Sequence, residues 1–106
     1  MGKIQYHKLV RDNIPDIIRE AGKSCTVSVL SDEDYLKMLD EKLNEELAEY
    51  QESKSMEELA DLLEVMRAVA AARGSSFEEV EEIRCIKAEK RGGFEKKLLL
   101  EEVIEP

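Results

Sequence analysis

The fold of this chain is decided between residues 45 and 61, which read EELAEYQESKSMEELAD. A short polar link around residues 53–55 separates two segments in which leucine and alanine stand beside pairs of carboxylates. On both sides of the link, apolar residues recur every three or four positions, which is the spacing of one face of an α-helix. Two helices joined by so short a link pack antiparallel. The stretch therefore predicts a helical hairpin.

Three serines mark where the longer helices are expected to begin. Ser31, Ser55 and Ser76 are each followed three residues later by an acidic residue, which is the pattern of a capping box. A shorter helix begins beside Pro15 and is closed by Gly22. The four expected helices span Ile14–Ala21, Ser31 to about Ser53, Ser55 to Gly74, and Ser76 to Gly92.

The rest of the chain adds little regular structure to this prediction. Residues 26–30 alternate in the manner of a short strand, and residues 98–104 could pair with them or form a last helical turn. We expect one domain over residues 1–106, mainly α, a helical bundle with a central antiparallel hairpin and at most a minor β-pair of 26–30 with 98–104. The apolar face of residues 56–73 is too wide for so small a bundle to cover, which favours a homo-oligomer, a dimer or tetramer.

Charge is distributed unevenly along the 106 residues. The formal net charge is −9, yet residues 26–83 hold seventeen acids and five bases, and both flanking segments are basic. An acidic surface repels phosphodiester backbones, so we expect no polymeric nucleic acid as a partner. No apolar run approaches the ~20 residues that cross a bilayer, and no secretory signal opens the chain, so we expect no membrane association and a cytoplasmic protein. Cys25 and Cys85 are isolated and predict free thiols.

The predicted hairpin would gather some of these acids. Glu46 and Glu49 are three residues apart on the first helix, and Glu58 and Asp61 are three apart on the second, so each pair projects from one side of its helix. Antiparallel packing can bring the two pairs opposite one another. Four converging carboxylates are typical of a Mg²⁺ site, which Mn²⁺ can also occupy. Glu45 points away from the leucine stripe, and we expect it to be solvated.

Spacing alone does not select the metal site. Acidic residues three apart occur seven times in this chain, and most such pairs belong on solvated helix faces. Glu58 also has an alternative role as the capping partner of Ser55. From the residues alone, a metal site and a set of solvated or capping carboxylates both remain open.

Basic residues near both ends are candidate phosphate ligands. Lys8 and Arg11 are three apart, so one helical turn would place them side by side, and Lys90 and Arg91 precede two glycines. Cations of this kind offset the charge of a polyphosphate. Lys90 and Arg91 have an alternative role, because bases in a last helical turn complement the helix dipole.

Three segments, in order, resemble one family. EELAE at 45–49 with ELAD at 58–61 resembles the EExxE…ExxD signature of the MazG-like all-α nucleoside triphosphate pyrophosphohydrolases. YHKLVRDNIP at 6–15 resembles the KLVRDKIP opening of a phosphoribosyl-ATP-pyrophosphohydrolase-like branch, and KRGGF at 90–94 resembles an element near the end of that branch. One departure is the interval between the two acidic motifs, which is shorter than is common in the MazG group.

The resemblance implies an enzyme that uses Mg²⁺ to hydrolyse a nucleoside triphosphate between the α- and β-phosphates, giving a monophosphate and pyrophosphate. The implied site residues are, for the metal, Glu46, Glu49, Glu58 and Asp61; for the base, Glu46 or Glu49; and for the phosphates, Lys8, Arg11, Lys90 and Arg91. Two other classes remain as alternatives. One is a non-catalytic oligomerisation or adaptor module, and the other is a nucleotide-binding regulator.

Overall fold

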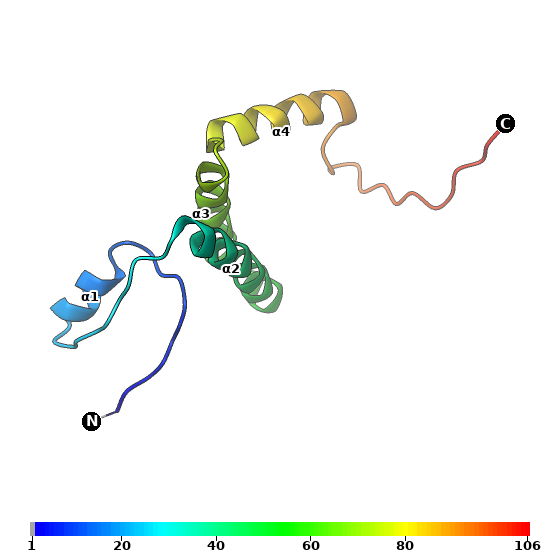
Figure 1. Cartoon of the computed structure of the whole chain (residues 1–106). Helices are drawn as coiled ribbons and strands as arrows, with labels where there is room; N and C mark the ends of the chain where they lie inside the picture. The colour runs from blue at the N-terminus through cyan, green and yellow to red at the C-terminus, as the bar shows by residue number, and fades with distance from the viewer. Residues whose placement is uncertain (1) are drawn as a thin grey trace.

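All regular secondary structure in the described chain is α-helical (Figure 1). The computed structural model describes residues 2–106 and contains α1 (Ile14–Glu20), α2 (Asp32–Ser53), α3 (Met56–Ala72) and α4 (Phe77–Arg91). No strand occurs between residues 2 and 106. Within the same range, no helix combines the length and the apolar character needed to span a bilayer. The predicted mainly α fold is confirmed.

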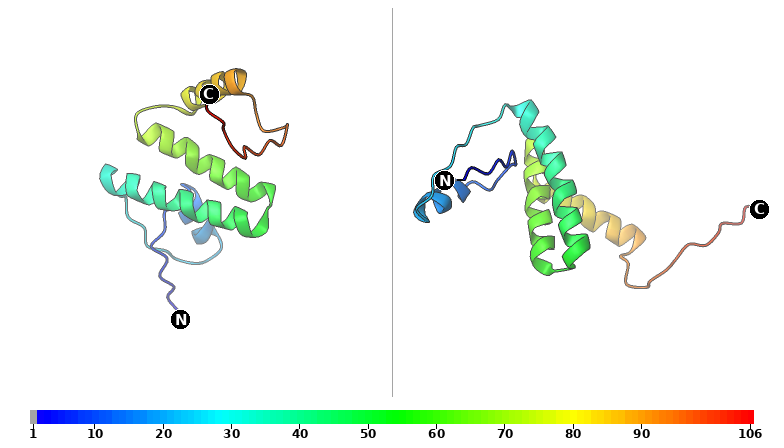
Figure 2. Two further views of the ribbon diagram at one scale, coloured as in Figure 1. Left: turned by 90° about the vertical axis from the view of Figure 1, so that its right-hand side faces the viewer. Right: turned by 90° about the horizontal axis from the view of Figure 1, so that it is seen from below.

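The centre of the fold is the hairpin of α2 and α3, which lie side by side and antiparallel (Figure 2). Only Lys54 and Ser55 separate the two helices. Lys54 turns the chain with a φ of 58°, and its N–H donates to the carbonyl of Tyr50 at 2.7 Å. At the other end of the hairpin, Arg73 Nη2 lies 3.0 Å from Asp40 Oδ2. The predicted central hairpin is confirmed.

Serine hydroxyls begin the three long helices as predicted. The Oγ atoms of Ser31, Ser55 and Ser76 accept hydrogen bonds from the backbone N–H three residues later, at 3.2, 3.3 and 3.1 Å. The second half of the capping box is replaced in α3, because the N–H of Ser55 donates to Ser53 Oγ at 3.2 Å. The carboxylate of Glu58 is therefore free of the capping role.

The predicted β-pair is wrong. Residues 26–30 form an irregular lead into α2, and residues 98–104 form an irregular tail after α4, neither strand nor helical turn. The reason lies in the direction of α4, which leaves the hairpin on the side opposite α1 and carries the tail away from residues 26–30 (Figures 1 and 2). The two segments never meet, so neither has a partner strand.

The interior of the chain is small. Among apolar side chains of the described residues, only Leu39 and Ala70 are buried, with Leu39 2% exposed. α2 packs on α3 and α3 on the start of α4, while α1 packs on no other helix. The radius of gyration is 19.0 Å, against about 13 Å for a compact chain of this length. The hairpin is thus the one well-packed unit among these helices.

Ser55 should contribute to stability through its cap. Ser55→Ala removes the acceptor for the Glu58 N–H, and we expect a loss of about 1 kcal/mol in the free energy of unfolding, or roughly 4–8 °C in Tm. Ser55→Thr keeps the hydroxyl and should change Tm by much less. Thermal unfolding followed by circular dichroism measures both; equal Tm values for Ser55→Ala and the parent would contradict the assigned cap.

Candidate metal centre

The short link brings the last turns of α2 beside the first turns of α3. As a result, carboxylate oxygens of Glu46, Glu58 and Asp61 lie within 4.8 Å of one another. Glu45, Glu46 and Glu49 form a second group with the same spread. We call these five residues the acidic cluster. Glu46 belongs to both groups and is its centre.

Two oxygens of the acidic cluster are buried without a partner. Glu46 is only 6% exposed, and Oε2 of Glu46 and Oε2 of Glu58 accept no hydrogen bond in the described chain. The other oxygen of Glu46 lies 3.5 Å from Lys42 Nζ. A buried carboxylate oxygen without a partner is costly. Carboxylate oxygens are the hard donors that Mg²⁺ and Mn²⁺ prefer, and here they lie within 4.8 Å of one another. This arrangement differs from a solvated helix face.

The protonation of the cluster reflects the same crowding. Burial raises the pKa of Glu46 above its usual 4.5, and the neighbouring carboxylate of Glu49 raises it further, against a smaller opposing effect of Lys42. The pKa of Glu58 is also raised, first by desolvation and then by the charges of Glu49 and Asp61. The folded chain therefore disfavours full ionisation of the cluster, and a bound cation would favour it.

The N-terminal segment supplies two positive charges to the cluster. Lys8 Nζ lies 3.1 Å from Glu45 Oε1, and Arg11 Nη2 lies 2.7 Å from Asp61 Oδ1. Burial on its own would raise the pKa of Glu45, but the hydrogen bonds and charges of Lys8 and Lys42 outweigh it and lower that pKa. The expectation that Glu45 is solvated is wrong, because the N-terminal segment crosses this side of α2.

A groove of about 520 Å³ opens beside the cluster, between the N-terminal segment, α1 and the hairpin. Glu46 and Asp61 stand in its wall. Most of the remaining wall is apolar, and its apolar members are Leu9, Ile14, Ile17, Tyr35, Leu39, Val65 and Ala68. This volume lies in the range of small-molecule sites, ~300–1,000 Å³.

Sequence reasoning missed Lys42 and the apolar groove. Lys42 precedes Glu45 and Glu46 by three and four positions on one helix, a spacing that identifies it as an ion-pair partner. The groove has no such signal, because it exists only where the N-terminal segment lies against the hairpin.

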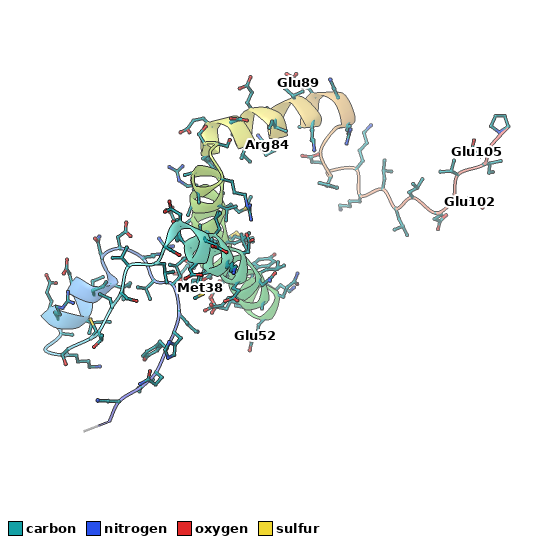
Figure 3. All side chains as sticks on the ribbon, in the orientation of Figure 1. Met38, Glu52, Arg84, Glu89, Glu102 and Glu105 are labelled. Atoms are coloured by element: carbon teal, nitrogen blue, oxygen red, sulfur yellow. The ribbon has the colours of Figure 1, made fainter. Side chains whose placement is uncertain are left out.

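Lys90 and Arg91 lie apart from the acidic cluster. They end α4, which packs on no helix of the described chain except α3. Figure 3 shows this helix, with Arg84 and Glu89 labelled, projecting from the hairpin. Arg91 lines a separate cavity of about 830 Å³ whose walls contain no residue of the acidic cluster. Within one described chain, then, only Lys8 and Arg11 of the four predicted phosphate ligands meet the carboxylates.

Comparison with known proteins gives a partial match. Over 42 residues the chain is 50% identical to a protein of Mycolicibacterium smegmatis described as uncharacterized; the match covers 40% of this chain and 43% of that relative. The chain thus spans less than half the length of the curated relative. No protein-family model and no solved structure matches the chain.

The cluster predicts opposite effects of Glu46→Gln with and without metal. Because the pKa of Glu46 is raised in the folded chain, its ionisation destabilises the fold. This penalty is absent below the unfolded pKa, grows as pH rises from the unfolded to the folded pKa, and is complete above the folded pKa. At about pH 7.5 without metal, Glu46→Gln should be more stable than the parent by about 1 kcal/mol. At about pH 4 the difference should vanish.

With Mn²⁺ or Mg²⁺ the order of stability should reverse, so that the parent is more stable than Glu46→Gln. The parent should gain Tm saturably with ion concentration, as binding to the folded state requires, and Glu46→Gln should gain little. The matched control is Glu41→Gln, which removes an exposed carboxylate of α2 outside the cluster. A parental gain that never saturates, or an equal gain in Glu46→Gln, would contradict the site.

Proposed function

We propose that this protein is a Mg²⁺-dependent nucleotide pyrophosphohydrolase, which cleaves a nucleoside triphosphate between the α- and β-phosphates. The observation that supports a metal-dependent reaction is the pair of buried, unpartnered carboxylate oxygens on Glu46 and Glu58. The choice of substrate rests on the resemblance to MazG-like pyrophosphohydrolases. The apolar groove beside the acids gives a nucleoside a place to lie.

The ion would be held by Glu46, Glu58 and Asp61, with Glu49 beside them. When bound, Mg²⁺ would neutralise phosphate oxygens and orient a water molecule for attack. Glu46 has one oxygen near Lys42 and the other buried without a partner. Its side chain is thereby fixed in direction, as a metal ligand needs to be.

Lys8 and Arg11 act as counterions that change partners. Without ligand they neutralise Glu45 and Asp61. With a cation held by the carboxylates, Lys8 and Arg11 would be free to contact an anionic ligand at the same place, where they would offset charge on the leaving pyrophosphate. Both side chains are more than half exposed, so this exchange requires no opening of the core.

The proton of the attacking water goes to Glu49. This residue lies beside Glu46, and unlike Glu46 it is exposed to solvent, where it can later lose the proton. The oxygen of water forms a bond to the α-phosphorus, and the bond from that phosphorus to the bridging oxygen breaks. The products are a nucleoside monophosphate and pyrophosphate.

The nucleoside itself is proposed to occupy the apolar part of the groove. Tyr35 and Ile17 line this part, while Glu46 and Asp61 stand in the same wall. Apolar and aromatic groups retain nucleoside bases by stacking and burial. A base held against Tyr35 would leave the triphosphate directed at the acids and at Arg11, which line the same groove.

Asp61→Asn tests the catalytic proposal. It keeps the shape of the side chain and removes the charge that binds the cation and holds Arg11. We expect pyrophosphate release with Mg²⁺ to fall by at least ~100-fold, with helicity unchanged. The assay is release of pyrophosphate from a panel of nucleoside triphosphates, with and without Mg²⁺.

Glu57→Gln is the matched control, because Glu57 is an exposed carboxylate on the first turn of α3 that belongs to neither acidic group. It should retain activity within ~3-fold. Parental turnover in Asp61→Asn would overturn the assignment of the metal ligands. Saturable metal binding with no turnover of any triphosphate would support the regulator alternative instead.

A further inference from the structure

Much of the surface of this chain is left uncovered. The accessible area is 9808 Å², whereas a compact monomer of 12.1 kDa exposes roughly 6,000 Å². The excess of roughly 3,800 Å² exceeds what one chain loses in a standard interface, ~800 Å². The chain therefore exposes far more surface than a stable monomer of its size, and enough to form a large interface.

Helix α4 is the longest element with little support from the rest of the chain. It has fifteen residues, none of them buried, and only its first turns approach α3. An isolated helix of about 15 residues is marginal in water, since helices depend on packing of an apolar face. Its apolar side chains Val80, Ile83 and Ile86 form a stripe at helical spacing and are between 38% and 48% exposed. This stripe has no cover within the chain.

The charges beside the stripe are self-complementary. At ~100° per residue, Glu79 lies about 40° and Lys90 about 20° from Ile83 around the helix. The face that carries the stripe therefore has an acid at one end and a base at the other. The first half of α4 also holds most of its acids, and its last turn is basic. A second α4 laid antiparallel would set Glu79 against Lys90 at both ends of the contact, whereas a parallel one would oppose like charges.

We propose that α4 is a self-association surface, which packs antiparallel against α4 of a second copy of this chain. The contact is centred between Ile83 and Ile86, because that register opposes Glu79 to Lys90 of the second copy. Such a face is identical on both copies, as a two-fold dimer requires. The pairing covers the stripe and gives α4 the packing that it lacks in one chain. It involves no residue of the acidic cluster.

Sedimentation of the full chain over about 1–500 μM tests the association. The parent should form a species of at least twice 12.1 kDa. Ile83→Glu should raise the dissociation constant at least ~100-fold. A parent that stays monomeric at the highest concentration would overturn the proposal and leave the face to a different protein. A parental oligomer unaffected by Ile83→Glu would overturn it as well.

Charge reversal tests the antiparallel register and does not depend on how well Ile83→Glu folds. Glu79→Lys and Lys90→Glu should each raise the dissociation constant ~10-fold or more, because each creates two like-charge contacts in the dimer. The double variant restores both contacts and should return to within ~3-fold of the parent. If the substitutions acted only by weakening α4 through its dipole, the double variant would be the worst of the three.

Glu78→Lys is the matched control. Glu78 and Glu79 share the first turn of α4, so both reversals carry the same cost to the dipole. Glu78 lies about 140° from Ile83, away from the stripe. Its reversal should leave the dissociation constant within ~3-fold of the parent. An effect equal to that of Glu79→Lys, or a double variant that is not restored, would refute the register.

Discussion

The two-residue link between α2 and α3 is the constraint on which the structure depends. It leaves no room for a crossing or a wide loop, so the last turns of α2 must lie beside the first turns of α3. Glu46 is carried inward by this packing and is buried at 6% exposure. The same link places Glu58 and Asp61 beside Glu46. A longer link would allow the acids to separate, and repulsion between them would favour that separation.

This arrangement of carboxylates lowers the stability of the fold, and packing of the hairpin does not require it. Like charges are held together, one of them is buried, and two carboxylate oxygens lack partners. Hydrophobic residues at these positions would give a more stable hairpin. The N-terminal bases offset part of the cost through Lys8 and Arg11, but their contacts reach Glu45 and Asp61 rather than the unpartnered oxygens. A cation at the cluster would offset the remainder, which is the physical basis for the proposed metal-dependent function.

The parts of the fold that depend on local signals were predictable from the sequence. The serine caps and the spacing of apolar residues predict α2, α3 and α4 to within two residues, and the short link predicts the hairpin. Contacts between distant segments were not predictable. Three features depend on long-range placement: the contact of Lys8 with Glu45, the groove beside α1 and the direction of α4. The predicted β-pair of 26–30 with 98–104 failed for the same reason. Glu46, Glu58 and Asp61 lie together because one short-linked hairpin carries them, a proximity that the sequence predicts. Whether a distant segment reaches them depends on its path: Lys8 and Arg11 of the N-terminal segment do, and Lys90 at the end of α4 does not.

The central claim is that Glu46, Glu58 and Asp61 form a divalent cation site. Anomalous diffraction from crystals grown with Mn²⁺ locates the ion without reference to any activity. The account predicts a strong anomalous peak among the carboxylates of these three residues, at coordination distances of ~2.1–2.2 Å, which Glu46→Gln removes. Absence of a peak at saturating Mn²⁺, or a peak that persists in Glu46→Gln, would contradict it.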